Sequence, residues 1–443
     1  MSAPTDLRRF RPAYPGDLLL DLTRDQLAAV GRLDARGGDL VTLDVGRLPG
    51  LVLVRHPDLV REVLVDLNEH LTKARGLRLA QQVLGRGLLT SEIPVHTRRR
   101  RLVLPAFHHQ RLRAYGAQMV EAARHEGEAW APGAPFDVAA SMNRLALAIA
   151  GRTLFGADVL SSAGRVSAAL GDALAAFDRA QFPFADRLTW LPLPANRRSR
   201  RARAVLDAVV YGLIDERRRA SRPGTDLLAM LLEAQDEETG AGMTDEEVRD
   251  EVMTLLLAGH ETTAVALAWT WALLAEHADV EARLHDEVDA LDGPPSFESL
   301  DRLPYTRAVV SESMRVRPPA WIFGREAARD VVLGGVPLRR GTTLLVSMYY
   351  LHRDPRFWPD PERVDPERFS TEARAERHKF AYLPFSAGRR GCIGEQFAWA
   401  ELVLALAALA QRWRLRPVGP RPRPHGSVTL RLSGPLPMVA ERR

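Results

Sequence analysis

The chain has 443 residues, of which 46% are hydrophobic and 26% charged, and its formal net charge is +5. This composition is typical of a globular protein with one large core or two smaller ones, and it excludes an intrinsically disordered chain. The single cysteine, Cys392, excludes an intramolecular disulfide and any zinc or iron-sulfur site built from several cysteines, so a reducing compartment is expected.

The N-terminal stretch, MSAPTDLRRFRPAYPGD, carries charges and prolines where a signal peptide or membrane anchor needs an apolar run. We therefore expect a cytoplasmic protein without a transmembrane anchor. The segments LVTLDVG and GLVLVRH, within residues 40–56, then predict a β-hairpin. From about residue 57 to residue 291 the apolar residues recur with helical period, so helices dominate this part of the chain.

Two arginine clusters lie in the helical part, RRRR at residues 98–101 and RRSRR at residues 197–201. No interleaved aromatic residues, zinc-finger spacing or recognition-helix pattern accompanies them, so nucleic acid is not an expected partner. Solvated helix faces are the common explanation of such clusters, and an acidic protein partner fits equally well.

A long helix is predicted from about residue 244 to residue 277, because TDEE at its start is a capping box. Residues 252–275 carry one formal charge, Glu261, over a length that could cross a bilayer. A carboxylate at the membrane centre costs roughly 2.5 to 3.5 kcal/mol, and His260, Thr262 and Thr263 add further polar atoms. A buried helix at the centre of a soluble fold is therefore expected.

The C-terminal third predicts short strands within residues 327–346 and 427–440, and a proline-rich, irregular segment at residues 354–369. After Cys392, apolar residues recur with helical spacing, so this cysteine precedes a helix start. The positive end of that helix and the nearby arginines favour the thiolate, which is a metal ligand; a small buried thiol is the alternative. No repeat or interdomain linker is evident, so one domain over residues 1–443 is expected.

The segment FSAGRRGCIG places Phe385, Gly388, Arg390, Cys392 and Gly394 in the spacing F-x-x-G-x-R-x-C-x-G. This pattern resembles the haem-ligand signature of the cytochrome P450 family. The resemblance implies a mainly α, single-domain cytochrome P450 fold, a triangular helical prism with a small β-rich region. It also implies non-covalent haem b, with the Cys392 thiolate as the iron ligand and with Phe385 and Gly394 beside the cofactor.

Two more motifs are similar to those of the same family. ESMR supplies Glu312 and Arg315, which with Arg368 of PERF match its buried Glu-Arg-Arg cluster; alone, the first two would be an ordinary surface ion pair. AGHETT places Ala258, Glu261 and Thr262 in the oxygen-activation motif. Reduction of dioxygen needs protons, so Glu261 and Thr262 are the implied catalytic residues and Ala258 lines the haem. A local helix distortion at Gly259 is also expected.

Four cations are implied to hold the haem propionates. His96 and Arg100 stand four residues apart in HTRRRR, Arg325 lies in FGREA, and Arg390 lies in the cysteine segment. Each arginine alone would more often be a solvated surface charge. The remaining arginines of HTRRRR, Arg98, Arg99 and Arg101, are expected to face solvent in part and to bind an acidic ferredoxin.

The implied activity is that of a haem-thiolate monooxygenase, which inserts one atom of O2 into a hydrophobic substrate of the carotenoid, terpenoid or fatty acyl type. Electrons are expected from a separate ferredoxin and its reductase, and the protein is expected to be a monomer. A peroxide-driven peroxygenase and a non-catalytic haem sensor are the alternatives. By resemblance, the substrate contacts lie in residues 72–89, 177–194, 255–258, 266, 320–323 and 433–436.

Overall fold

The computed structural model describes residues 5–11, 21, 24–43, 50–156, 163–180, 191, 193–219, 226–236 and 238–443. Its residue contacts group the chain into two compact units. The first comprises Met1–Arg75, Ser311–Cys392 and Arg423–Ser433, and the second comprises Gly76–Val310, Ile393–Pro422 and Gly434–Arg443. Strands dominate the first unit and helices the second. That both units form one domain over residues 1–443 remains a prediction.

The first unit is built on a six-stranded sheet with the strand order β1-β2-β3-β9-β6-β4. The pairs β1/β2 and β3/β9 are parallel, and the other three pairs are antiparallel. Its elements are β1 (Leu7–Phe10), α2 (Gln26–Asp34), β2 (Leu40–Leu43), β3 (Leu51–Val54), α3 (Pro57–Arg61), η1 (Glu62–Asp66), η2 (Asn68–His70), β4 (Leu71–Lys73), β6 (Ile322–Ala327), β7 (Val331–Leu333), β8 (Val336–Leu338), β9 (Thr343–Ser347), α15 (Met348–Leu351), η7 (Pro366–Phe369), α16 (Thr371–Glu376), η8 (Lys379–Ala381), η9 (Gly388–Arg390), β11 (Pro424–Gly426) and β12 (Leu430–Leu432).

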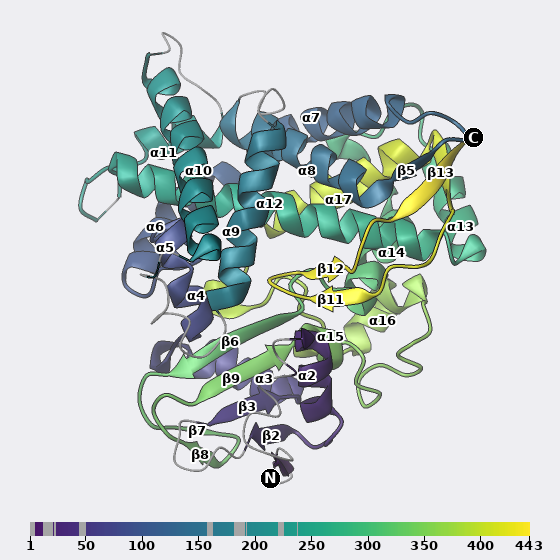
Figure 1. The fold of residues 1–443 in the computed structure, drawn as a ribbon. Coiled ribbons are helices and arrows are strands. Elements are labelled where there is room, and N and C mark those ends of the chain that lie inside the picture. Colours follow the sequence, from purple (N-terminus) through teal and green to yellow (C-terminus); the bar gives the residue numbers. More distant parts are fainter. Residues whose placement is uncertain are drawn as a thin grey trace. The chain divides into compact units, whose positions relative to one another are not determined.

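The predicted hairpin is confirmed as the antiparallel pair β2/β3, in which Leu40 faces Val54 and Leu43 faces Leu51. Its connection, residues 44–49, lies outside the described residues. Leu40, Val52 and Val54 are buried in an apolar cluster that Leu344 and Val346 of β9 extend. In Figure 1, β2, β3, β9 and β6 lie side by side. Strand β6, which carries Arg325, is therefore held in place by the packed sheet.

The second unit is an assembly of helices with a three-stranded sheet in the order β10-β13-β5. Two helices, α4 (Arg75–Leu79) and α14 (Pro304–Val316), include residues of both units. The other elements are α5 (Gln81–Leu84), α6 (Val95–Val103), η3 (Leu104–Phe107), α7 (His109–Glu128), β5 (Pro135–Asp137), α8 (Val138–Phe155), α9 (Ala163–Ala180), α10 (Pro194–Arg219), α11 (Leu227–Glu233), α12 (Asp245–Leu274), α13 (Ala278–Asp289), η6 (Phe297–Arg302), α17 (Glu395–Ala410), β10 (Trp413–Pro417) and β13 (Pro437–Arg442).

The predicted long helix is α12, and it begins with the predicted capping box. The Glu247 amide donates to Thr244 Oγ1 (3.2 Å), and the Thr244 amide donates to Glu247 Oε2 (3.1 Å). α12 packs on α8, α10 and α17 (Figure 1). Among the described helices it alone is long and apolar enough to cross a membrane, and 83% of its most apolar window is buried inside the protein. Burial in the second unit accounts for its composition.

The second unit is also held by an aromatic cluster beside the three-stranded sheet. The Trp130 ring lies 6.3 Å from the Trp271 ring of α12 and 5.9 Å from the Trp413 ring of β10, measured between centroids. Trp271 is fully buried and Trp413 nearly so. Such pairs add about 0.5 to 1.5 kcal/mol each beyond the burial of their area, so they fix one end of α12 to the sheet.

Candidate functional site

The cysteine segment of the first unit is a compact loop closed by backbone hydrogen bonds. The Cys392 amide donates to the Phe385 carbonyl oxygen (2.9 Å), and the Gly391 amide donates to that of Gly388 (3.0 Å). Cys392 is exposed, whereas Phe385 is partly buried. The loop therefore leaves Cys392 uncovered by the rest of the protein, as a site for another group needs.

Gly388 is required in this loop for two independent reasons. Its φ of +72° lies in the left-handed region that disfavours side chains. A Cβ atom there would also come within 2.4 Å of the Leu64 carbonyl oxygen in η1. Gly394, the N-cap of α17, differs: its φ is −89°, and a Cβ atom would meet only a Phe107 ring carbon at 3.6 Å. The protein itself leaves room at Gly394, so this glycine fits the close approach of another group.

The centre of α12 has one open face on a helix that is otherwise buried. Ala258 is exposed, and Gly259 and Thr262 are partly exposed, while Glu261 is 6% exposed. Thr262 Oγ1 donates to the Ala258 carbonyl oxygen (2.6 Å), and Thr263 Oγ1 donates to that of Gly259 (2.7 Å). The helix continues from residue 245 to residue 274, and the threonine hydroxyls bond its carbonyls as expected, so a local distortion at Gly259 remains a prediction.

Two of the predicted propionate partners share one face of α6 in the second unit. His96 is buried and Arg100 partly buried, four residues apart on the same helix. In the first unit, Arg325 of β6 is 7% exposed, and its guanidinium lies 5.1 Å from the Phe323 ring centroid. Arg390 is partly buried in the cysteine loop. Three arginines and a histidine are the kinds of group that bind the two propionate carboxylates of a haem.

Of the other arginines of α6, Arg98 and Arg101 face solvent in part, as expected, but all three arginines are paired with carboxylates. Arg99 is 4% exposed, and its Nη1 lies 3.0 Å from Glu251 Oε1. Arg98 Nη1 lies 2.9 Å from Glu247 Oε1, and Arg101, although exposed, pairs with Asp236 (3.1 Å) and Glu238. Carboxylates on α12 and in the loop before it thus hold Arg99 as a buried structural residue, and a docking role for Arg98 and Arg101 remains a prediction.

The Glu-Arg-Arg cluster of the first unit is confirmed as a buried structural site. Arg315 is fully buried, and its Nε and Nη2 atoms lie 2.7 and 2.8 Å from the two carboxylate oxygens of Glu312. Arg315 also donates to the carbonyl oxygens of His352, Pro361 and Arg363, and Arg368 Nε lies 3.8 Å from Glu312 Oε1. The cluster thus fixes the irregular segment that precedes the cysteine loop.

Sequence reasoning did not identify Glu401, a buried carboxyl on α17. It is 1% exposed, and burial raises its pKa to about 8. The Thr263 hydroxyl donates to Gly259, so neither carboxyl oxygen receives a hydrogen bond from the described residues. The sequence feature that could have identified Glu401 is that it is the single acidic residue within the apolar run of residues 397–410.

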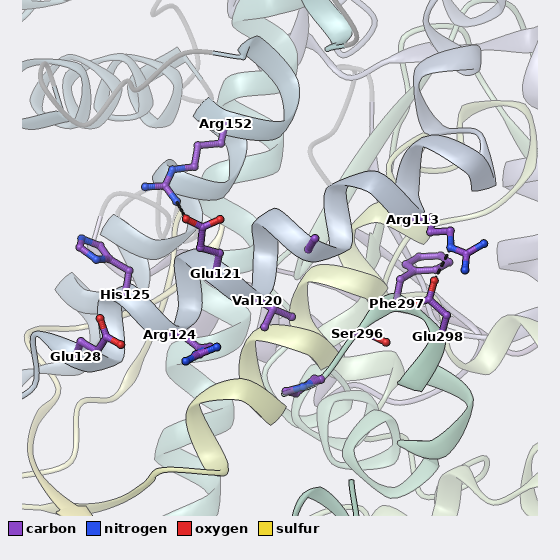
Figure 2. Close-up of a pocket in the computed structure, with 12 residues that line it drawn as sticks. Arg113, Val120, Glu121, Arg124, His125, Glu128, Arg152, Ser296, Phe297 and Glu298 are labelled. Carbon is purple, nitrogen blue, oxygen red and sulfur yellow. Dashed lines mark hydrogen bonds and ion pairs between the residues drawn. The ribbon is translucent and has the colours of Figure 1, made fainter. Parts of the chain in front are cut away.

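A separate cavity of about 500 Å³ lies between α7 and the segment that opens η6 (Figure 2). Arg113 faces Glu298 and Arg152 faces Glu121 across its rim, as Figure 2 shows. A neighbouring cavity of about 570 Å³ shares Arg124 with it. None of the predicted site residues lines either cavity, and the paired charges describe a solvated surface groove.

Comparison with known proteins agrees with the site's composition. The family model described as Cytochrome P450 matches residues 18–437. Cyclooctatin synthase from Streptomyces melanosporofaciens is 41% identical over 95% of this chain and 92% of its own length. Pentalenene oxygenase from Streptomyces avermitilis is 36% identical over 85% of this chain and 84% of its own length. A crystal structure of the cytochrome P450DA heme domain superposes with a TM-score of 0.82 at 28% identity, over 100% of this chain and 98% of that one.

The chain therefore belongs to the cytochrome P450 family and has its fold. It is a haem-dependent monooxygenase, as the sequence predicted. The residues present fit the cofactor: a single exposed thiol, a set of cations for two carboxylates, and an open patch on an otherwise buried helix. The assignments to individual residues remain predictions.

Proposed function

We propose that the protein inserts one oxygen atom from O2 into a terpenoid, with electrons from a separate ferredoxin and reductase, in the cytoplasm. The carrying observation is the similarity over nearly the full length to relatives named cyclooctatin synthase, cyclooctat-9-en-7-ol 5-monooxygenase and pentalenene oxygenase. Among the substrate classes expected from the sequence, these names favour terpenoids over carotenoids and fatty acyl chains. Of the predicted substrate segments, residues 181–190 and 192 lie outside the described residues.

In this proposal Cys392 is the iron ligand and the only metal ligand. His96, Arg100, Arg325 and Arg390 neutralise the propionates, and Phe385, Gly394 and Ala258 give the porphyrin room. When bound, the haem supplies the redox chemistry that activates dioxygen. Glu261 supplies a buried carboxyl, and Thr262 supplies a hydroxyl on the open face of α12, for the transfer of protons.

The experiment that tests the substrate class is a spectral titration of the haem protein. Cyclic terpene hydrocarbons and their alcohols, fatty acids and carotenoids are added in turn, and displacement of the distal water is read from the Soret band. Turnover with surrogate redox partners then tests for a product that has gained one oxygen. Tight binding of fatty acids or carotenoids with no terpenoid response would overturn the proposed substrate class, and turnover with peroxide alone would support the peroxygenase.

Replacing Thr262 by alanine is expected to uncouple the enzyme. Haem and substrate binding persist, but product formed per electron consumed falls roughly tenfold or more, because a positioned proton donor contributes about 10² to 10⁴ in rate. The matched control is Thr263→Ala, which also removes a hydroxyl bonded to the helix backbone, but from a buried position on α12. Equal coupling in Thr262→Ala and the wild type would remove Thr262 from the mechanism.

The ferredoxin proposal needs a different test residue from those on α6, since Arg98 and Arg99 are tied to α12. Arg389 lies in the cysteine loop, and its side chain is 71% exposed. Its ion pair with Glu69 (3.0 Å) is equally exposed, and such pairs contribute little to stability, so the cation remains open to a partner.

Reversing this charge with Arg389→Glu should slow ferredoxin-driven reduction at low salt, while reduction by dithionite is unchanged. Exposed charges at the edge of a protein–protein interface act mainly on the association rate. Salt at physiological strength shortens the Debye length to about 8 Å and so weakens their effect. Arg302→Glu is the control, because Arg302 also pairs with an exposed carboxylate, that of Asp292. Stopped-flow reduction that is equally fast in both variants and the wild type would place the docking site elsewhere.

A further inference from the structure

Two adjacent acidic residues on the N-terminal half of α12 bind a turn of the backbone instead of solvent. Asp250 is 4% exposed, and its Oδ2 accepts a hydrogen bond from the Arg86 amide (2.6 Å). Glu251 is fully buried, and its Oε2 accepts one from the Leu88 amide (3.0 Å). Successive carboxylates thus hold successive parts of residues 85–91, which we call the 85–91 turn.

The backbone of the 85–91 turn lies so close to α12 that no side chain would fit at Gly85 or Gly87. A Cβ atom on Gly85 would come within 1.8 Å of Asp250 Oδ1, and the φ of Gly85 is +74°. A Cβ atom on Gly87 would lie 2.1 Å from Thr254 Oγ1 and 2.5 Å from the Asp250 carbonyl oxygen. Thr90 closes the turn internally, because its hydroxyl donates to the Gly85 carbonyl oxygen (2.6 Å). The glycines therefore serve this close approach.

The carboxylates pair with one arginine from α6 and with one from α12 itself. Glu251 pairs with Arg99 of α6 at 3.0 Å, and Asp250 pairs with Arg249 at 2.9 Å. Arg249 Nε in turn lies 2.7 Å from Asp207 Oδ1 of α10. Burial raises the pKa of Glu251, while the Leu88 amide and Arg99 lower it. Three helices and the turn thus meet at one buried charged network.

A contribution to the stability of the fold does not by itself explain why this buried charged network is present. A buried ion pair usually contributes no more than apolar side chains of similar volume, because both charges lose their hydration. Its directional bonds instead specify where the turn lies. Gly87 lies against Thr254, which is about one helical turn before Ala258, where the open face of α12 begins.

We propose that Asp250 and Glu251 are positioning residues that hold the 85–91 turn at the edge of the open α12 face and thereby restrict the size of ligand that this face admits. The proposal deepens the proposed function, since it assigns selectivity for ligand shape to residues outside the haem contacts. It does not depend on terpenoids being the substrate.

The test uses two variants that release the turn in different ways. Asp250→Asn weakens the bonds to Arg86 and Arg249 by removing the charge, and Gly87→Ala places a methyl group between the turn and α12 without changing any charge. Glu246→Gln is the control, because it removes an exposed carboxylate from the first turn of the same helix.

Hydrogen exchange of the haem-bound protein is measured first. Amides of residues 85–91 should exchange about tenfold faster in both release variants and at the wild-type rate in the control, the change expected for loss of one buried charge-assisted hydrogen bond. The second readout is binding of imidazole and 4-phenylimidazole to the haem. The preference for the smaller ligand should fall about fivefold or more in the release variants.

These readouts separate a positioning role from a merely structural one. A lower melting temperature with unchanged exchange in the 85–91 turn and an unchanged preference between the imidazoles would overturn the proposal. Faster exchange without any change in that preference would also overturn it, because the turn would then not limit the ligand. A failure of terpenoids to bind the wild type would count against the proposed function alone, since neither readout uses a terpenoid.

Discussion

Replacing Cys392 by serine is expected to abolish the red-shifted Soret band of the reduced carbonyl complex and to lower product formation by roughly a hundredfold or more. Even outer partners of a metal site commonly contribute 10- to 100-fold, and this residue is the proposed ligand itself. No other thiolate can replace it, because the chain has no second cysteine. The serine hydroxyl stays protonated at neutral pH, so it does not supply the anionic ligand that the thiolate supplies.

Carbonyl difference spectra of the purified variant check this expectation. Arg389→Glu, in the same loop, is the control and should keep the red-shifted band, because its side chain is exposed and does not close the loop. Haem should still associate with the serine variant if the cations hold its propionates. A red-shifted band in Cys392→Ser would contradict thiolate ligation and with it the residue assignment of the site.

The second large effect concerns the pH dependence of stability, through Glu401. Its pKa is about 8 in the folded protein against 4.5 for the ordinary side chain, because burial disfavours the carboxylate. The folded state then holds a proton that the unfolded state releases, so this group's contribution to stability is complete below pH 4.5 and is lost as the pH rises towards 8. The complete loss, reached above pH 8, amounts to about 5 kcal/mol at 1.36 kcal/mol per pKa unit.

Glu401→Gln replaces the neutral acid by a neutral amide of the same shape and is expected to abolish this loss. Urea unfolding at pH 5 and pH 9 measures it: the variant should be close to the wild type at pH 5 and more stable by several kcal/mol at pH 9. Glu395→Gln, at the partly exposed start of the same helix, is the control. An identical decline in the wild type and Glu401→Gln would show that the carboxyl is ionised in the folded state.

Local sequence was sufficient for the parts of the site that are built from consecutive residues. The capping box at Thr244 and Glu247, the helix after Cys392 and the hairpin β2/β3 all depend on neighbours in the chain, and all are confirmed. The same holds for Glu312 and Arg315, which are three residues apart in one helix. In each case, backbone geometry over one or two turns decides the structure.

Contacts between residues that are far apart in the sequence could not be predicted from local sequence patterns. Arg99 stands among four consecutive arginines and is typical of a solvated face, yet its partner Glu251 lies 152 residues further along the chain. Gly87 gives no local sign that it lies against Thr254. Nor does a single glutamate in an apolar run reveal whether its carboxyl is ionised, because that depends on how many other segments exclude water from it.

The solitary exposed thiol has a practical consequence for handling the protein. If Cys392 is the iron ligand, as proposed, a chain with its cofactor has no thiol left to react with a maleimide or to oxidise. A chain without it keeps one accessible thiol, which can join two molecules through an intermolecular disulfide. Counting reactive thiols per chain therefore measures the fraction of a preparation that lacks haem, and reducing agents should suppress covalent dimers in that fraction alone.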